Sequence, residues 1–253
     1  MMKGNTLAVI PARLASTRLP NKPLVEIGGV QLVVRVLRQV RRCSSVDRVV
    51  VAADDERILN VVEKAGGEGV LTPPDLPSGG DRVAWVATLM EDADIVLNVQ
   101  VDDPLVGPDM IDPLVEALAL DPDSALAVLA KRIENKAEVS DPNVVKMVSG
   151  FDGRALYFSR SPIPYPRNTG GVWYKHIGPY AYRRDFLLSF ASWEPTPLEK
   201  TESLEMLRVL ERGYSITCVQ ASRDTIEIDT PQDIARMEAH LKRYGDDIYE
   251  SGN

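Results

Sequence analysis

The chain has 253 residues, of which 44% are hydrophobic and 26% are charged, and this length and composition fit one large α/β domain or two small ones. Its net charge of −8 argues against general nucleic-acid binding, which requires a broad basic face. Cys43 and Cys218 have no metal-ligand or redox spacing, and two histidines are too few for a multi-histidine metal site.

The first predicted element is a strand near the N-terminus. Residues 1–5 lead directly into the apolar run Leu7–Ile10, which is typical of a strand buried on both faces. No signal peptide precedes this strand, and no apolar run elsewhere is long enough to span a bilayer. We therefore expect a cytoplasmic protein that does not contact membranes.

A polar, cationic loop follows this strand. Pro11 ends the strand because proline has no amide hydrogen for a sheet ladder. The loop combines small and hydroxyl residues with Arg13, Arg18 and Lys22, so it can direct amides and cations at one polyanion. It has neither the Walker spacing nor a Gly-x-Gly-x-x-Gly motif. From the loop alone, phosphate binding and a solvated surface loop are equally good interpretations.

Helical and strand-like patterns alternate through the rest of the N-terminal half. This alternation predicts a parallel sheet with helices on both faces. Asp54-Asp55 can cap the second helix, and Gly66-Gly67 can end it. The predicted helices span Val30–Arg42, Glu56–Ala65 and Asp81–Met90, and the predicted strands span Arg48–Ala52, Val70–Thr72 and Asp94–Gln100.

Two polar segments follow strands of this predicted sheet. The loop from Pro11 to Lys22 follows the first strand, and Asp102-Asp103 follows the strand that ends at Gln100. Ligands of parallel α/β sheets bind at the carboxyl ends of the strands. We therefore expect one cleft to contain both segments.

The second half has a less regular pattern. We find no internal repeat, low-complexity tract or interdomain linker, which predicts a single domain over residues 1–253. The predicted strands are Ala125–Lys131, Val144–Ser149, Ala155–Arg160 and Ser215–Val219, and the predicted helices are Arg184–Ser192, Leu198–Gly213 and Gln232–Tyr244.

Carboxylates at two places are candidate ligands for a hard divalent cation. Magnesium binds oxygen donors, typically one or two carboxylates together with substrate phosphates. Asp102-Asp103 and Asp229 supply such donors, and a metal between them would reconcile acids with a phosphate-binding loop. The alternatives are a turn at Asp102-Asp103-Pro104 and a helix N-cap at Asp229, and the local sequence favours the N-cap.

His176 lies in a segment rich in aromatic residues. A lone histidine is more often a structural hydrogen-bonding group than a catalyst. The same half carries cations that could bind an acidic group of a second substrate, although each one singly is better explained as a solvated surface charge. The aromatic residues are Trp173, Tyr174, Tyr180 and Tyr182, and the cations are Arg160, Arg167, Lys175 and Arg183.

In this order, the motifs make the chain resemble the 3-deoxy-manno-octulosonate cytidylyltransferases, also called CMP-Kdo synthetases, from about Leu7 to about Leu241. Any one motif could arise by chance, but six in the right order could hardly do so. The matching segments are Pro11-Ala12-Arg13 through Ser16-Thr17-Arg18 to Lys22-Pro23-Leu24; Asn98-Val99-Gln100 with Asp102 and Pro104; Ala155–Arg160; His176-Ile177-Gly178 with Tyr180 and Tyr182-Arg183; Pro197-Leu198-Glu199 with Glu202, Leu204-Glu205 and Leu207-Arg208; and Asp229-Thr230-Pro231 with Asp233.

The resemblance implies the magnesium-dependent transfer of CMP from CTP to an eight-carbon sugar acid, Kdo, with release of pyrophosphate for lipopolysaccharide or related glycan synthesis. It implies a Rossmann-like, mostly parallel sheet with helices on both faces, a smaller antiparallel dimerisation region, and a homodimer. About residues 1–125 would form the nucleotide-binding half, about 126–231 the sugar-acid and dimer half, and 232–253 a C-terminal helix and tail.

The resemblance also assigns roles to individual residues. Arg13 and Lys22 would hold the triphosphate with help from loop amides around Ser16, and Asp102 and Asp229 would hold magnesium; these four form the implied catalytic set. The implied nucleotide-binding residues are Pro11, Ala12, Arg13, Ser16, Thr17, Lys22, Ser78, Gly79, Arg82 and Gln100. The implied sugar-acid-binding residues are Gln100, Arg160, His176, Tyr180 and Glu202.

The chain also departs from the family pattern. The residues implied in phosphate and metal binding match the family pattern, whereas residues implied in binding the acceptor differ from it. The alternatives are therefore a cytidylyltransferase for another acid (an amino-Kdo, a sialic-type acid or a non-sugar acid) and a catalytically silent nucleotide-binding paralogue. The departures are Val101 in place of glycine, Asp103 in place of glutamate, Gly80-Asp81 in place of Thr-Glu, Ala53 in place of threonine and Met206 in place of glutamine.

Overall fold

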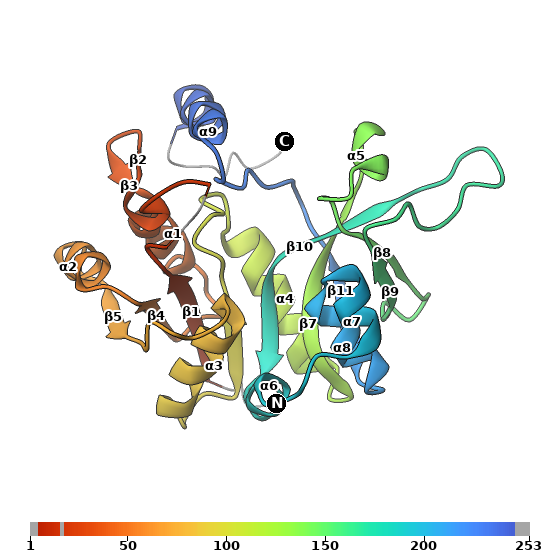
Figure 1. Ribbon diagram of the computed structural model, residues 1–253, viewed down its shortest axis with the longest axis horizontal. Coiled ribbons are helices and arrows are strands. Elements are labelled where there is room, and N and C mark those ends of the chain that lie inside the picture. Colours follow the sequence, from red (N-terminus) through yellow and green to blue (C-terminus); the bar gives the residue numbers. More distant parts are fainter. Residues whose placement is uncertain (1–4, 16–17, 246–253) are drawn as a thin grey trace.

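The computed structural model of the chain describes residues 5–15 and 18–245 and is built on one nine-stranded sheet (Figure 1). Seven strands form a continuous path in the order β11-β7-β10-β6-β1-β4-β5, and β8 and β9 extend from β10. The strands of this sheet are β1 (Thr6–Ala12), β4 (Arg48–Ala53), β5 (Glu68–Leu71), β6 (Ile95–Asn98), β7 (Ser124–Arg132), β8 (Lys146–Ser149), β9 (Ala155–Ser159), β10 (Tyr174–Arg183) and β11 (Ser215–Gln220).

The strand directions confirm the predicted α/β class. β1 is parallel to both β4 and β6, β4 is parallel to β5, and β11 is parallel to β7. β10 runs antiparallel to both of its neighbours, β6 and β7. β8 and β9 form the smaller antiparallel part with β10. The sheet is therefore mostly parallel, and β10 joins its two halves.

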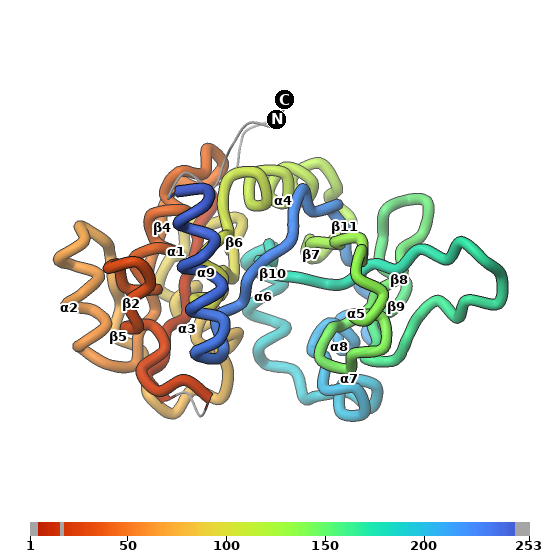
Figure 2. Tube along the Cα trace, turned by 90° about the horizontal axis from the view of Figure 1, so that it is seen from above, coloured from red at the N-terminus to blue at the C-terminus, as the bar shows by residue number. Residues whose placement is uncertain are grey.

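Two helix layers cover this sheet, as Figure 2 shows from above. On β1, Ala8 and Ile10 pack against the layer of α1, α2 and α4, whereas Leu7 and Val9 pack against the layer of α3, α6 and α8, as the strand period of two requires. The helices are α1 (Leu32–Val40), α2 (Glu56–Lys64), α3 (Gly79–Leu89), α4 (Pro108–Leu120), α5 (Ala137–Ser140), α6 (Arg184–Ala191), α7 (Pro197–Glu202), α8 (Glu205–Glu211) and α9 (Pro231–Tyr244), with a short 3-10 turn, η1 (Lys22–Leu24). In the described part of the chain, no helix has the length and apolar character that a membrane span requires.

Most predicted elements are present, and the differences have local causes. The first strand does not end at Pro11: β1 runs to Ala12, and Pro11 lies opposite Ala52 of β4. α4 was not predicted from the sequence; it begins at Pro108 and contains Pro113. The helix expected over 198–213 is two helices, α7 and α8, because Ser203 between them adopts a left-handed φ of 54°. The hairpin of β2 (Glu26–Ile27) and β3 (Val30–Gln31) delays the start of α1 to Leu32.

An extended segment, residues 221–230, crosses the top of the sheet from β11 to α9 (Figures 1 and 2). At its end, Thr230 is the N-cap of α9: its hydroxyl accepts from the Asp233 amide, and the Asp233 carboxylate accepts from the Thr230 amide at 2.9 Å. The interpretation of Asp229 as the N-cap is therefore wrong. The side chain of Asp229 is left available for the cleft.

Candidate functional site

A cavity of about 490 Å³ lies at the carboxyl ends of β1 and β6, where the sequence predicted a cleft. The cavity contains both polar segments that follow these strands. Its lining residues are Pro11, Ala12, Arg13, Ala15, Arg18, Lys22, Pro23, Gly79, Arg82, Gln100, Val101, Asp102, Glu227 and Asp229.

The predicted phosphate loop is fixed at both of its described ends. The Leu14 amide donates to Asp54 Oδ1 at 3.1 Å, which anchors the first half of the loop to the end of β4. Asn21 adopts a left-handed conformation and places Lys22 at the start of η1. Arg13 is exposed on the cavity wall. Ser16 and Thr17 lie outside the described residues, so their predicted roles stay predictions.

The Lys22 ammonium lies between two aspartates. Its Nζ is 2.7 Å from Asp102 Oδ2 and 2.7 Å from Asp229 Oδ1. Arg18 contacts the other oxygen of Asp229 at 2.9 Å. Burial alone would lower the pKa of Lys22, but the two carboxylates outweigh burial and raise it. The lysine is therefore firmly charged, and the four groups form one ion-paired cluster.

Backbone contacts bring the two aspartates together although 127 positions separate them (229 − 102). Asp102 lies in the turn after β6, and the Ile228 amide of the crossing segment donates to the Asp102 carbonyl at 2.8 Å. Ile228 is fully buried beneath this contact, next to Leu105 and Met237. The position of Asp229 beside Asp102 is therefore set by a packed core.

Asp103 does not share this role. Its carboxylate is buried and accepts a hydrogen bond from the Leu105 amide at 3.1 Å. Burial raises its pKa to about 7. Asp103 therefore stabilises the turn, and of the adjacent pair only Asp102 lines the cavity.

The α3 end of the cavity is built by helix capping. Ser78 is the N-cap of α3 and forms a capping box with Asp81, and it is not among the lining residues. Gly79 does line the cavity, beside Pro11. Arg82 lines it from a nearly buried position and donates to the Thr72 hydroxyl and the Pro73 carbonyl. The N-terminus of α3 therefore reaches the cavity at Gly79, and Arg82 contributes a fixed cation. The Ser78 amide donates to Asp81, so the predicted contact of Ser78 with a nucleotide stays a prediction.

The same cluster fits a divalent cation by the chemistry of its donors. Two carboxylate oxygens converge on one positively charged group, the Lys22 ammonium, and both side chains are about one quarter exposed, at 27% and 24%. Within the described ranges, no group of three or more Asp, Glu, His or Cys residues could hold a metal by itself. A cation at this site would therefore need further oxygen ligands from a substrate.

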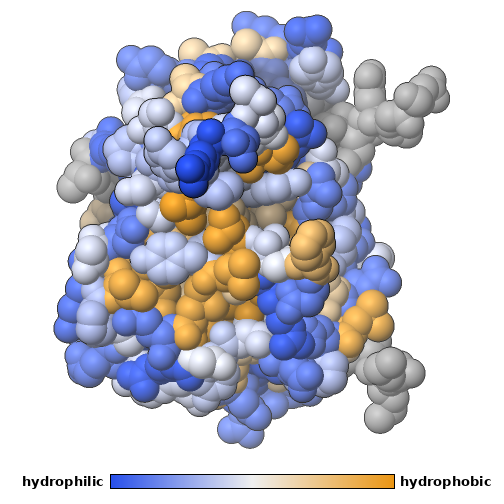
Figure 3. Space-filling view, turned by 90° about the vertical axis from the view of Figure 1, so that its right-hand side faces the viewer, coloured by the Kyte–Doolittle hydropathy of each residue, from blue (hydrophilic) through white to orange (hydrophobic). Residues whose placement is uncertain are grey.

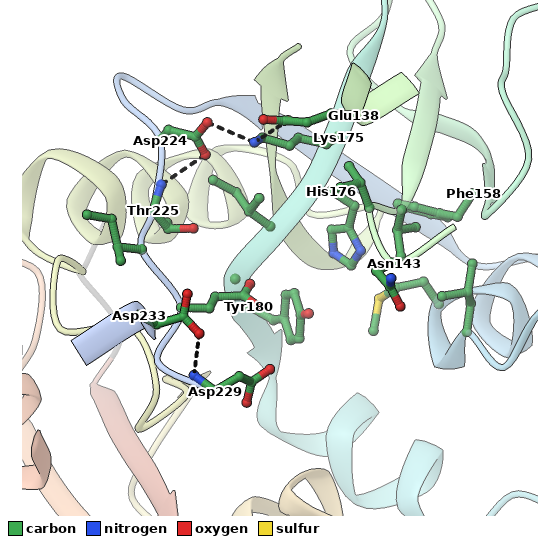
Figure 4. Close-up of a pocket in the computed structure, with 18 of the residues that line it drawn as sticks. Glu138, Asn143, Phe158, Lys175, His176, Tyr180, Asp224, Thr225, Asp229 and Asp233 are labelled. Carbon is green, nitrogen blue, oxygen red and sulfur yellow. Dashed lines mark hydrogen bonds and ion pairs between the residues drawn. The ribbon is translucent and has the colours of Figure 1, made fainter. Parts of the chain in front are cut away.

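A second cavity, of about 890 Å³, adjoins the first (Figure 4). Arg18, Glu227 and Asp229 line both cavities, so a group bound in one can reach a group bound in the other. The remaining lining residues are Glu138, Asn143, Val144, Val145, Phe158, Lys175, His176, Ile177, Gly178, Tyr180, Ser203, Leu204, Glu205, Met206, Asp224, Thr225, Ile226, Thr230, Asp233 and Arg236.

His176 and Tyr180 project from β10 into this second cavity (Figure 4). Their rings stack with centroids 5.0 Å apart, and Phe158 packs on the other side of His176, also at 5.0 Å. His176 Nε2 is shielded from solvent and has no hydrogen-bond partner among the described residues. Burial lowers the pKa of His176 to about 4, so the ring is neutral at pH 7 and presents an unused polar nitrogen.

Arg160 and Glu202 do not line either cavity. Glu202 accepts from the Ser159 hydroxyl at 2.6 Å and from the Arg160 amide at 2.9 Å. Arg160 donates to the carbonyls of Pro142, Glu202 and Ser203. These two residues therefore connect β9 to the segments around Pro142 and Ser203 without lining a cavity. Their predicted contact with a sugar acid stays a prediction.

Three residues at the second cavity were missed by the sequence analysis as site residues. Glu205 and Glu227 line the cleft, and desolvation there, followed by repulsion from neighbouring carboxylates, raises the pKa of each. The Lys146 side chain is fully buried beneath the wall and donates to the carbonyls of Asp141, Val144 and Arg160. Glu205 lies within a matched motif, which was a usable signal, whereas nothing in the local sequence marks Lys146 or Glu227.

Comparison with known proteins shows which family the chain is similar to. A sequence model of a family described as cytidylyltransferase matches residues 7–217. A 3-deoxy-manno-octulosonate cytidylyltransferase of Syntrophotalea carbinolica is 46% identical over 246 residues, covering 93% of this chain and 98% of the relative. The enzyme of the same name from Fusobacterium nucleatum is 40% identical over 237 residues, covering 93% and 96%.

Solved structures give the same result. A CMP:2-keto-3-deoxy-manno-octonic acid synthetase in complex with CTP superimposes with a TM-score of 0.91 at 38% identity, covering 95% of this chain and 99% of the other. A 4-diphosphocytidyl-2C-methyl-D-erythritol synthase from Anaerococcus prevotii has a TM-score of 0.66 at 17% identity over 96% of this chain and 100% of the other, which shows a shared fold alone.

The first prediction concerns His176. The pKa of an unfolded histidine is about 6.5, so between that value and the folded pKa of about 4 the unfolded chain binds a proton that the folded chain does not. The free energy of unfolding should therefore fall by about 2 kcal/mol from pH 7 to pH 5 because of this residue. Urea unfolding at both pH values should show a smaller loss for His176→Phe.

Proton NMR tests the same assignment directly. His176 is the only histidine left in a His240→Phe variant, so its ring resonance can be followed without ambiguity. A titration midpoint close to 4 is expected, and a midpoint near 6.5 would contradict the buried, neutral ring.

Proposed function

The chain belongs to the 3-deoxy-manno-octulosonate cytidylyltransferase family, and from this premise we propose that it transfers CMP from CTP to the anomeric hydroxyl of Kdo or a close analogue, releasing pyrophosphate. We further propose that the product serves lipopolysaccharide or related glycan synthesis. The observation that carries the reaction is the junction of two cavities at Asp229, with the cations of the phosphate loop on one side and His176 on the other.

The first cavity suits the nucleotide. Arg13, Arg18 and Lys22 can neutralise the triphosphate, and the N-terminus of α3 at Gly79 can donate amides to it. The acceptor hydroxyl would then attack the α-phosphorus in line while pyrophosphate leaves. Charge grows on the phosphoryl oxygens during this step, and fixed cations stabilise it without any covalent enzyme intermediate.

We propose that Asp102 and Asp229 hold the magnesium ion on which the reaction depends. When bound, magnesium supplies charge stabilisation to the phosphoryl group. The two aspartates already share one cation in the form of the Lys22 ammonium, so their separation suits a common ion. Lys22 and Arg18 are then free to contact the nucleotide's phosphates.

The second cavity suits the acceptor. β10 places His176 and Tyr180 on its wall, and Tyr180 is paired with Asn98 at the end of β6, beside the nucleotide cavity. We propose that residues 1–125 serve the nucleotide and residues 126–231 the acid. This division follows the sheet, since β7–β11 carry the acceptor wall and β1–β6 the phosphate loop.

A different acid is the second candidate acceptor, and Met206 favours it. Met206 lines the second cavity, is only 4% exposed and stands where the family commonly has glutamine. It cannot hydrogen-bond a hydroxyl group of a sugar as an amide can. Val101 is a milder departure: no positive φ is found there among the described residues, so the valine fits without backbone strain.

The second prediction tests the reaction. With CTP, magnesium and a panel of sugar acids, we expect pyrophosphate and a CMP-sugar in equal amounts. Asp102→Asn and Asp229→Asn should each lower kcat by about a hundredfold or more, because each removes transition-state charge stabilisation. Asp185→Asn, at a 96% exposed position on α6, is the matched control.

One result would support a different function. If CTP binds and no acid in the panel yields pyrophosphate, the chain is a silent nucleotide-binding paralogue.

The third prediction concerns the acceptor. Met206→Gln should raise kcat/KM for Kdo by about tenfold, since it restores one hydrogen bond to a polyhydroxylated acid. Met206→Leu keeps an apolar side chain and should leave the order of preference among acids unchanged. Equal kcat/KM values for Kdo in the wild type and Met206→Gln would show that Met206 does not determine acceptor specificity.

We also propose that the chain forms a homodimer through the face that carries β8 and β9. Apolar side chains gather in a band on this side of the molecule (Figure 3). On β9 Leu156 is 63% exposed, and in the loop before β10 Val172 is 40% exposed. Large exposed apolar patches commonly mark protein interfaces.

The fourth prediction tests this interface. Size-exclusion chromatography with light scattering should give a dimer for the wild type and a monomer for Leu156→Glu, because a buried unpaired charge opposes association. Leu71→Glu is the control, since Leu71 is 50% exposed on β5 at the opposite end of the sheet. A monomeric wild type, or a dimeric Leu156→Glu, would overturn the proposed interface.

A further inference from the structure

We propose that Lys22 is an internal counter-ion that competes with the divalent cation, so that the site takes the complex of a metal with a nucleoside triphosphate and binds either part alone only weakly. This inference rests on the proposed function in one respect, namely that Asp102 and Asp229 bind the metal. It adds that the ligand is recognised as a metal–triphosphate complex. It also proposes that Lys22 weakens binding of the free metal and strengthens binding of the nucleotide.

The geometry of the ion-paired cluster is the first step. Both aspartate oxygens that contact Lys22 are 2.7 Å from the same nitrogen, so they lie at most twice that distance apart. A magnesium ion binds oxygens at about 2.0–2.1 Å, so two oxygens on one ion lie no more than about 4.2 Å apart. An ion bound to both aspartates would contact the two oxygens that the ammonium contacts, so the ion and the ammonium would compete for the same space between the carboxylates.

Charge balance is the second step. Without ligands, Lys22 and Arg18 carry two positive charges that cancel the two negative charges of Asp102 and Asp229. A divalent cation alone would displace Lys22 and leave excess positive charge in a partly enclosed cavity. The Lys22 side chain is only 12% exposed, so water screens this excess poorly.

The opposite binding order fails for the complementary reason. A triphosphate alone would draw Lys22 and Arg18 toward its phosphates and leave Asp102 and Asp229 unpaired beside a polyanion. Glu227 adds a third carboxylate beside the two aspartates, whereas Arg13 and Arg82 on the wall of the same cavity stay available to the phosphates. Repulsion between these carboxylates and the phosphates would weaken binding.

Metal and triphosphate together remove both imbalances. The metal pairs with the aspartates, and the released lysine and arginine pair with the phosphates. Each ligand thereby raises the affinity for the other, and thermodynamic linkage requires the two enhancements to be equal. Loss of the Lys22 charge should consequently strengthen binding of the free metal while weakening binding of the nucleotide.

The fifth prediction measures metal binding in the absence of nucleotide, with Mn²⁺ followed by electron paramagnetic resonance. Lys22→Met should bind Mn²⁺ about tenfold more tightly than the wild type, because a like charge no longer competes at the site. Equilibrium dialysis should show the reverse for the nucleotide, with CTP bound at least about tenfold more weakly by the variant in the presence of magnesium.

Three variants separate the possible causes. Lys64→Met removes one charge from an exposed position on α2 and should leave Mn²⁺ affinity at the wild-type value. Lys22→Met combined with Asp229→Asn should lose the gain, which places the metal between the aspartates. Lys22→Gln repeats the test with a polar residue, and circular dichroism checks that each variant is folded.

Two outcomes would overturn the proposal: a Lys22→Met affinity for Mn²⁺ no higher than that of the wild type, or a gain that persists in the double variant. Neither measurement uses an acceptor or turnover. Failure of the proposed CMP transfer would therefore leave these results unchanged and can be told apart from failure of this inference.

Discussion

The structure depends on the cancellation of opposite charges at one edge of a parallel sheet. The chain must hold cations for a polyphosphate and carboxylates for a metal within a few ångströms, and before ligands bind these groups can neutralise only one another. Lys22 meets this constraint by forming ion pairs with both Asp102 and Asp229. The same pairing determines which ligands can displace Lys22 from the two aspartates.

The fold maintains this arrangement with backbone contacts and buried apolar residues. The crossing segment is fixed to β6 by the hydrogen bond between Ile228 and Asp102 and by the burial of Ile228. Thr230 and Asp233 then satisfy the first amides of α9 between them, so Asp229 is not consumed as a helix cap. A single substitution in this cap would therefore affect the position of Asp229 as well as the stability of the helix.

Sequence patterns predicted the parts of this protein that local physics determines. Short continuous apolar runs marked β1, β4 and β6, and the polar segments after β1 and β6 predicted their shared cleft. The left-handed Ser203 had no local signal, because serine rarely adopts that conformation. Thr230, and not Asp229, caps α9 because it forms a capping box with Asp233 just before Pro231, a local signal that the sequence analysis did not use. The positive charge of Arg160 made it a candidate ligand-binding residue. Its guanidinium instead donates to carbonyls of Glu202 and Pro142, which are distant in the sequence and could not be predicted from it.

The two sides of the cleft therefore differ in what evolution can change without loss of the fold. On the nucleotide side, Lys22 and Arg18 balance the charges of Asp102 and Asp229, so any single neutral replacement leaves the cluster with a net charge. On the acceptor side, Lys146 and Arg160 hold the walls through backbone carbonyls. Those bonds do not involve the side chain of Met206, which lines the cavity and packs in the core below it. A family built this way can keep one phosphoryl chemistry while its acid acceptor changes.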